Sequence, residues 1–444
     1  MQKMKNGKKV LSVCLSLAMA AGMLSTSAFA SWNVYGGSNN HNAVVTEAPT
    51  RPDKSGLDSY IQLHCTGSGW DGVDNVPVLQ TVNGTTYAYV LYDGYGASGA
   101  LVAKIRCAEN GGSSIVWTTD PYGTEGTSLN AKSGFQLSTP YLDDNGTPND
   151  ASDDTLYVGT ISQYDDYEGG EWLTGTGSKV MALTGLDQNK PTVTNVLTGI
   201  NGQINTPITT DGTYLYFGTW PGGSRAGTYY QVKLSDYSVK TFTPDSYGFY
   251  WAGAVSDGTN VYFGSDNGLL YWRSIADFDT TGGVLDLTDV ASDAGNVRST
   301  VMLDDGYLYF TTQGGYLWCC SYDDGLTVEW HKKLGATSTS TPTKVGDRIY
   351  VGYYSGFNAG GVQCVSADGS SVKTVVEGDG FPVQSSIVVM GDGTGTDYLY
   401  FNTNAQKGVG YCYSYDGTTG SQVWGTTGDT YALGGMAIDN GYAV

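Results

Sequence analysis

The 444-residue sequence predicts an all-β protein of the β-propeller class, because of its composition and an internal repeat. It contains 64 glycines and 34 tyrosines, and only 15% of its residues are charged, which is typical of turn-rich, aromatic β proteins. The segment TPITTDGTYLYFGT from Thr206 returns as AGAVSDGTNVYFGS from Ala252. Each copy has two short apolar stretches around a Gly/Asp turn, the pattern of a β-hairpin. Such hairpins, each followed by two more strands and recurring at about 40 to 50 residues, predict propeller blades.

The first 30 residues have the features of a secretory signal peptide. Four lysines flank an apolar run from Val10 to Met23, and Ala28 and Ala30 form an A-x-A cleavage site. We therefore expect cleavage after Ala30 and a secreted, extracellular or cell-surface protein. The formal net charge of −21 argues against binding to nucleic acid or anionic lipid, and no later apolar run is long enough to span a membrane. We expect a monomer that binds no nucleic acid and inserts into no membrane.

Seven copies of the hairpin can be followed along the chain, with third and fourth strands such as GYLWCCSY and TVEWHKK after them. The copies begin at Val76, Thr139, Thr206, Ala252, Ser299, Ser340 and Ser385. The C-terminal GGMAIDNGYAV matches the first two strands of another blade, to which Asp58–Cys65 could add an outer strand. We therefore expect eight four-stranded blades over residues 31–444, the last closed by strands from both termini, with seven blades as the alternative. Because that last blade lacks a third strand, we also expect the protein to continue beyond Val444.

Within the repeat the pattern TPxxxDGxxYFGx is followed by a third strand and by a fourth of the type TGxxVW, and the predicted mature chain opens with SWNVYGGSNNHNAVVTEAPT. These features resemble those of PQQ-like (quinoprotein alcohol dehydrogenase-like) propellers of extracellular bacterial proteins. The resemblance covers nearly all of residues 31–444 and implies the fold. It leaves the activity open, because this superfamily includes quinone dehydrogenases and non-catalytic scaffolds alike.

The pair Cys319 and Cys320 lies in one of the predicted third strands. Cys320, Cys364 and Cys412 each stand four residues before an aspartate, which predicts equivalent packing positions in three successive blades and leaves Cys319 outside the series. Resembling quinone dehydrogenases carry an adjacent Cys-Cys disulfide near the cofactor, so the resemblance implies a redox role as one alternative. Neighbouring side chains of a strand point to opposite faces, which favours a structural role. A metal-binding role is the third alternative, and the oxidation state of the pair stays open.

The acidic turn insertion DDNGTPNDASDD is a candidate site for a hard cation such as Ca²⁺, which prefers several oxygen ligands on a flexible loop. Its candidate ligands are Asp143, Asp144, Asn145, Asp150, Asp153 and Asp154. The spacing does not match an EF-hand loop, and a solvated turn is the alternative reading of the same residues.

The loops between second and third strands, and those between blades, are long and rich in aromatic residues. In blades of four antiparallel strands, both kinds of loop emerge on the same side, so their aromatic residues should gather on one face. Flat rings on Gly-rich loops of a rigid scaffold suit molecular recognition. The candidate ligand-binding residues are Tyr164, Tyr167, Trp172, Trp220, Trp251 and Tyr354. The alternative is that several of them fill the central channel or pack between blades.

These observations favour a secreted, non-catalytic propeller that presents an aromatic loop face to a glycan or a surface protein. The sequence supplies no catalytic residues, so enzymatic activity is left open. We expect no cofactor, with Ca²⁺ as an option; PQQ is not expected, because no residues can be matched to a quinone site. A quinone-dependent oxidoreductase and a spacer for a domain beyond Val444 are the alternative functions.

Overall fold

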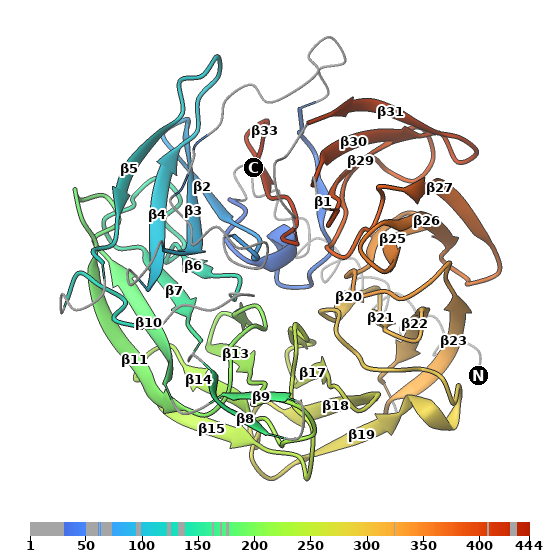
Figure 1. The fold of residues 1–444 in the computed structure, drawn as a ribbon, viewed down its shortest axis with the longest axis horizontal. Coiled ribbons are helices and arrows are strands. Elements are labelled where there is room, and N and C mark those ends of the chain that lie inside the picture. The colour runs from blue at the N-terminus through green and yellow to red at the C-terminus, as the bar shows by residue number, and fades with distance from the viewer. Residues whose placement is uncertain are drawn as a thin grey trace, which may run out of the picture. The chain divides into compact units, whose positions relative to one another are not determined.

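The computed structural model describes residues 31–49, 61, 63, 73–94, 99–121, 126–131, 138–161, 164–168, 171–174, 177–323, 325–405, 408–426 and 433–444, with the backbone alone at 164–168 and 171–174. Residues 31–444 form one compact unit in which sheets follow one another around a common axis (Figure 1). The predicted signal peptide lies outside the described residues and stays a prediction. Within the described ranges, no helix has the length and apolar character needed to cross a membrane.

Seven sheets form the blades, each with four antiparallel strands used in chain order, and the seventh sheet also has a fifth, parallel strand, β1 (Val44–Val45). The first three are β2–β5 (Val78–Val82, Thr85–Asp93, Ala100–Arg106, Ser114–Thr118), β6, β7, β10 and β11 (Tyr141–Asp143, Thr155–Gly159, Ser178–Thr184, Thr192–Ile200), and β12–β15 (Thr209–Thr210, Tyr214–Gly218, Tyr229–Lys233, Val239–Phe242). The fourth and fifth are β16–β19 (Val255–Ser256, Asn260–Gly264, Leu269–Ser274, Gly282–Asp286) and β20–β23 (Met302–Asp304, Tyr307–Thr312, Tyr316–Ser321, Thr327–Lys333). The sixth and seventh are β24–β27 (Thr343–Val345, Arg348–Ser355, Ala359–Ser366, Val372–Asp379) and β28–β31 (Val388–Met390, Asp397–Asn402, Gly410–Tyr415, Gly420–Gly425).

The expectation of eight four-stranded blades is wrong: the described residues form the seven blades of the alternative and two small two-stranded sheets, one of them β8 (Tyr164–Glu168) with β9 (Glu171–Thr174). The C-terminal residues form only the two-stranded sheet of β32 (Ile438–Asp439) and β33 (Tyr442–Ala443). This sheet lies against the first blade, where the Thr81 hydroxyl donates to the Asp439 carboxylate (2.6 Å). Of Asp58–Cys65, only residues 61 and 63 are described, and neither is in a strand. Two strands of two residues are too short to build a blade with buried faces of its own.

A tyrosine at one register of the second strand explains the repeat. In every blade it lies directly opposite the same position of the first strand. The seven are Tyr89, Tyr157, Tyr216, Tyr262, Tyr309, Tyr350 and Tyr400. In the third and fourth blades the tyrosine hydroxyl donates to the aspartate of the preceding turn, over 2.7 Å to Asp211 and 2.6 Å to Asp257. The Asp-Gly turn and the tyrosine therefore form one local unit, in which a buried hydroxyl finds its acceptor.

Close packing between neighbouring blades explains the glycine that ends the YFG strands. A Cβ at Gly264 would lie 2.1 Å from Val297 Cγ1, and one at Gly218 would lie 2.6 Å from the Phe249 Cβ. No real Cβ atom comes so close to another carbon, so these two positions accept only glycine without a shift of the next blade.

The prediction that Cys320 is equivalent to Cys364 and Cys412 is wrong by one residue. Cys319, Cys364 and Cys412 each lie opposite the repeat tyrosine of their blade, and Cys320 is the one outside the series. Two aspartates, Asp323 and Asp324, follow the third strand of the fifth blade in the sequence. The prediction used the spacing to Asp324, whereas Asp323 is the one that stands four residues after Cys319. Cys319 and Cys320 are buried free thiols in two separate hydrophobic clusters, as expected for neighbours on a strand. A packing role fits this arrangement.

Residues 31–45, here called the axial segment, tie blades together that are distant in sequence. Their carbonyl oxygens accept hydrogen bonds from first-strand N–H groups of the first, second, fifth and seventh blades. The pairs are Leu79 to Trp32 (2.8 Å), Leu142 to Asn33 (2.8 Å), Leu303 to Asn40 (2.9 Å) and Val389 to Ala43 (2.9 Å). The segment contains the short 3-10 helix η1 (Tyr35–Gly37) and ends in β1 (Val44–Val45), which pairs in parallel with β28. One stretch of chain thus satisfies the inner edges of several blades.

Candidate ligand-binding site on the propeller axis

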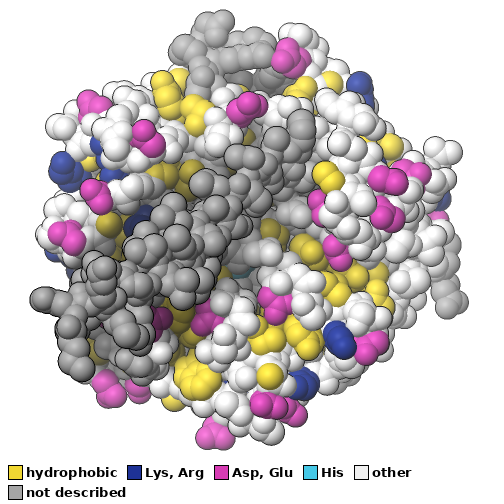
Figure 2. Space-filling model, turned by 180° about the vertical axis from the view of Figure 1, so that it is seen from behind, with side chains coloured by type: hydrophobic (Ala, Val, Ile, Leu, Met, Phe, Trp, Pro, Cys, Tyr) yellow, Lys and Arg dark blue, Asp and Glu magenta, His cyan; other side chains and the backbone are white. Residues whose placement is uncertain are grey.

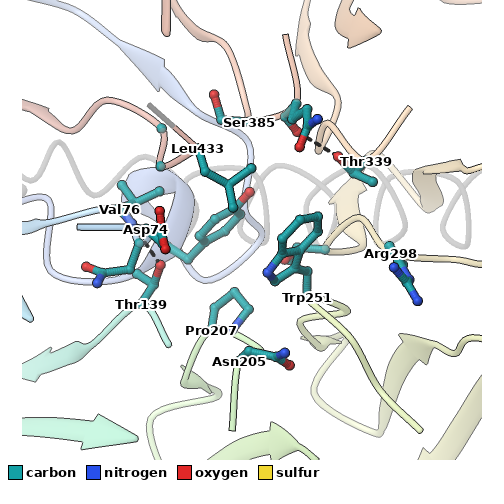
Figure 3. Close-up of a pocket in the computed structure, with 16 residues that line it drawn as sticks. Asp74, Val76, Thr139, Asn205, Pro207, Trp251, Arg298, Thr339, Ser385 and Leu433 are labelled. Carbon is teal, nitrogen blue, oxygen red and sulfur yellow. Dashed lines mark hydrogen bonds between the residues drawn. The ribbon is translucent and has the colours of Figure 1, made fainter. Parts of the chain in front are cut away.

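A pocket opens on the axis where the segments leading into the first strands converge (Figure 3). In six blades it is lined by the residue four positions before the first strand begins. These residues are Asp74, Asn205, Trp251, Arg298, Thr339 and Gln384. The pocket is open to solvent and has a cavity volume of about 70 Å³. A site built this way receives one side chain from almost every blade.

The axial segment closes one side of the pocket with Tyr35. The Tyr35 hydroxyl is hydrogen-bonded to Thr341 Oγ1 (3.0 Å), and the side chains of Thr300 and Ser386 also act to lower its pKa. These three hydroxyl residues occupy equivalent positions in the fifth, sixth and seventh blades. Each lies two residues before the first-strand residue that pairs with the conserved-register tyrosine of the second strand. Burial raises the pKa of Tyr35, so its hydroxyl stays protonated at neutral pH.

His41 fixes the backbone of the axial segment beneath Tyr35. Its Nδ1 lies 2.9 Å from the Tyr35 carbonyl oxygen and its Nε2 lies 2.7 Å from that of Ala254. Burial lowers the pKa of His41. The side chain therefore links the segment to the fourth blade.

An aromatic cluster forms one wall of the pocket. The rings of Tyr250 and Trp251 lie 4.7 Å apart, and those of Trp220 and Tyr250 lie 5.1 Å apart in an edge-to-face arrangement. Trp251 is half-buried, lines the pocket and has a φ of 59°. This left-handed backbone is costly for a bulky residue and persists only where the surroundings impose it.

Arg298 adds a charge to this wall, but the charge is compensated. Its Nε donates to Asp266 Oδ1 (2.7 Å) and its Nη2 to Asp266 Oδ2 (2.6 Å), in a bidentate pair. The guanidinium also lies 4.3 Å from the centre of the Tyr250 ring. Burial raises the pKa of Asp266, while the hydrogen bonds from Arg298 oppose that rise. The pair anchors Arg298 and compensates its charge.

The structure places three of the six predicted ligand-binding residues around Arg298. Trp251 lines the pocket, Trp220 packs edge-to-face on Tyr250, and the charge of Arg298 acts on the half-buried Tyr354. The other three, Tyr164, Tyr167 and Trp172, belong to the hairpin of β8 (Tyr164–Glu168) and β9 (Glu171–Thr174), and their side chains lie outside the described part of the structure. The ligand-binding role of all six stays a prediction.

The acidic insertion forms the turn between β6 and β7, and its polar groups bond to one another. Within the insertion, the Asp143 carboxylate accepts from the Asn145 N–H (3.2 Å) and Asp144 Oδ1 from the Gly146 N–H (3.0 Å). Asp150 Oδ1 accepts from the Ser152 hydroxyl (2.6 Å) and Asp153 Oδ1 from the Thr147 hydroxyl (2.9 Å). Asp154 instead accepts from Gln80 on β2. Among the described residues, no group of three or more His, Cys, Asp or Glu side chains has the arrangement of a metal site. The Ca²⁺ site stays a prediction.

The described residues do not match the quinone site of the resembling dehydrogenases. Cys319 and Cys320 are buried in the blades, and neither lines the axial pocket. Asp74 is the one carboxylate among the lining residues, whereas Ca²⁺ takes six to eight oxygen ligands, usually with several carboxylates. Tyr35 closes the pocket from the side of the axial segment. The residues present therefore do not fit a quinone held by a divalent cation.

No family model and no curated protein matches this sequence. The fold is similar to that of quinohemoprotein alcohol dehydrogenase from Comamonas testosteroni, with a TM-score of 0.59 and 9% identity over 95% of this chain and 77% of that one. It is also similar to a europium-containing methanol dehydrogenase, with a TM-score of 0.54 and 11% identity over 91% and 86% of the two chains. BamB from Moraxella catarrhalis matches with a TM-score of 0.48 and 14% identity over 82% and 89%, which carries no argument. Identities this low show the fold alone, and that fold is the β-propeller that the resemblance to PQQ-like proteins predicted.

Proposed function

We propose that the protein is a secreted, non-catalytic binding scaffold that takes its ligand, part of a glycan or of a surface protein, at the axial pocket. The observation that carries the proposal is Trp251, an indole held in a left-handed backbone at the point where leading segments from the blades converge. Strained residues cluster at sites where a side chain must be held ready for a ligand. Secretion rests on the predicted signal peptide.

The surface supports this class of partner. Acidic side chains are scattered over the face in Figure 2, in keeping with the net charge of −21. Hydrophobic side chains are also visible on this face, interspersed with polar ones. Such a surface disfavours polyanions and leaves neutral glycans and proteins as partners.

Labelled protein applied to a glycan array and to intact bacterial cells tests the proposal. We expect binding that Trp251→Ala abolishes. Trp330→Phe is the matched control, since Trp330 lies on β23 in the fourth strand of its blade and packs on Tyr309. Binding that survives Trp251→Ala unchanged would place the ligand elsewhere and reject the axial site.

A further inference from the structure

Two side chains that suit a cationic group line the axial pocket. Asp74, in the segment that leads into the first blade, and Trp251, in the segment that leads into the fourth, are both half-buried and lie on different sides of the pocket (Figure 3). A carboxylate accepts charge-assisted hydrogen bonds from an ammonium group, and among aromatic rings an indole attracts a cation most strongly. The pair therefore offers a cation both an acceptor and an aromatic surface.

The backbone next to Asp74 is fixed by hydrogen bonds to two blades. The side-chain Nδ2 of Asn75 donates to the Leu91 carbonyl of the first blade (2.7 Å). The Val76 N–H donates to Thr139 Oγ1, in the segment that leads into the second blade (3.1 Å). Asn75 and Val76 are both buried. The segment that carries the carboxylate is thus held in place before any ligand arrives, which lowers the entropy cost of binding.

The indole is held equally firmly. The Trp251 carbonyl accepts from the Gly253 N–H (2.9 Å), and the Phe249 N–H donates to the Thr219 carbonyl (3.0 Å) on the other side of the loop. The Tyr250 ring packs on the indole with 4.7 Å between the ring centres. These contacts maintain the left-handed backbone of Trp251 and the direction of its side chain into the pocket.

The charges around the pocket favour a cation. Arg298 is the one basic side chain among the described lining residues, and two hydrogen bonds commit its guanidinium to Asp266. In Figure 3 this guanidinium points away from Asp74. Counting Asp266, two carboxylates and one guanidinium are the charged groups of the described residues here, and the whole chain has a net charge of −21. The local and the long-range fields therefore both attract cations.

The size of the pocket selects a slender ligand. A cavity volume of about 70 Å³ has room for a few water-sized groups. An unbranched alkyl chain that ends in an ammonium group fits such a space, whereas a sugar ring with its substituents is wider. Because the pocket is open to solvent, a side chain that projects from a partner protein can enter it.

We propose that the axial pocket binds a lysine side chain of a partner protein, with the ammonium group at Asp74 and the alkyl chain against Trp251. The inference rests on the proposed function and narrows its ligand to one kind of side chain.

NMR titration of the purified protein with Nα-acetyl-lysine N-methylamide, here called the blocked lysine, tests the proposal. Its matched neutral probe carries a second acetyl group on Nε, and methyl glucosaminide, an amino sugar, supplies an ammonium group on a ring. We expect the blocked lysine to bind with a Kd that rises with salt, and the doubly acetylated probe to bind at least tenfold more weakly.

Variants assign the binding to the two side chains. Asp74→Asn and Trp251→Ala should each raise the Kd of the blocked lysine about fivefold or more. Asp236→Asn is the matched control: it removes the same charge from an exposed turn between β14 and β15, and should leave the Kd unchanged. Thermal unfolding checks that each variant is folded, and the comparison of the probes on the wild type needs no variant.

The outcomes separate this inference from the proposed function. Equal binding of the acetylated probe, tighter binding of methyl glucosaminide, or a Kd that Asp74→Asn leaves unchanged would overturn the assignment of a lysine side chain to this pocket. If the blocked lysine does not bind while attachment to cells still depends on Trp251, the lysine inference fails and the scaffold proposal stands. If neither depends on Trp251, both fail.

Discussion

Replacing Asp397 by alanine tests whether a buried charge holds the sixth and seventh blades together. The Asp397 carboxylate is fully buried and accepts hydrogen bonds from Arg348 Nη1 (2.7 Å), the Tyr350 hydroxyl (2.6 Å) and the Gly393 N–H (3.0 Å). Removing one partner of a buried ion pair costs about 3–5 kcal/mol, because the other charge is left uncompensated. For about 410 residues the entropy of unfolding is about 0.9 kcal/mol/K, so we expect Tm to fall by about 3–6 °C.

Differential scanning calorimetry of the wild type and the variant measures this shift. Asp293→Ala is the matched control, because Asp293 pairs with Lys333 (2.9 Å) at the surface with 64% of its side chain exposed. It should leave Tm almost unchanged, since exposed ion pairs contribute little. Asp397→Asn keeps an acceptor oxygen and should fall between wild type and Asp397→Ala. A shift below about 1 °C for Asp397→Ala, or one equal to that of the control, would refute the reasoning.

Three further predictions concern titration. Burial raises the pKa of Asp154 to about 6, so between about pH 4 and 6 the folded state binds more protons than the unfolded chain. The free energy of unfolding should therefore fall as pH rises through this range. In urea unfolding, Asp154→Asn should remove the fall and raise the free energy of unfolding at pH 7 by up to about 3 kcal/mol. Burial lowers the pKa of Lys104 to about 8, so between about pH 8 and 10 the unfolded chain binds more protons and the free energy of unfolding should rise with pH. Lys104→Met should remove this rise. Parallel plots of unfolding free energy against pH for wild type and variant would contradict the prediction. Burial raises the pKa of Cys319 to about 12, so Ellman's reagent should leave Cys319 and Cys320 unmodified until the protein unfolds, and rapid modification of either in the native protein would speak against their packing role.

The blades could be predicted from the sequence because their signals are local. An Asp-Gly turn and a tyrosine such as Tyr216 lie within one hairpin, where the strand period of two residues fixes which side chains are buried. The number of blades was not predictable in this way, since closure depends on which terminal strands find partners. The path of the axial segment could not be predicted either, because its contacts join Asn40 and Ala43 to the fifth and seventh blades, which begin far along the chain.

The candidate site was predictable in part. Trp251 stood out as an aromatic residue in a loop between blades, whereas Asn75 and Asn205 are single polar residues with no local signal. Counting back from the first strand of each blade would have found Asn205 and Arg298, because both hold the register of Trp251. The lining of the pocket as a whole emerges only when residues from different blades are brought together in space.

Binding of the labelled wild type and of Trp251→Ala to a glycan array and to intact bacterial cells tests the central claim most directly. The account predicts that the wild type binds and that Trp251→Ala, folded by its thermal unfolding, does not. Equal binding of the two proteins would contradict the account.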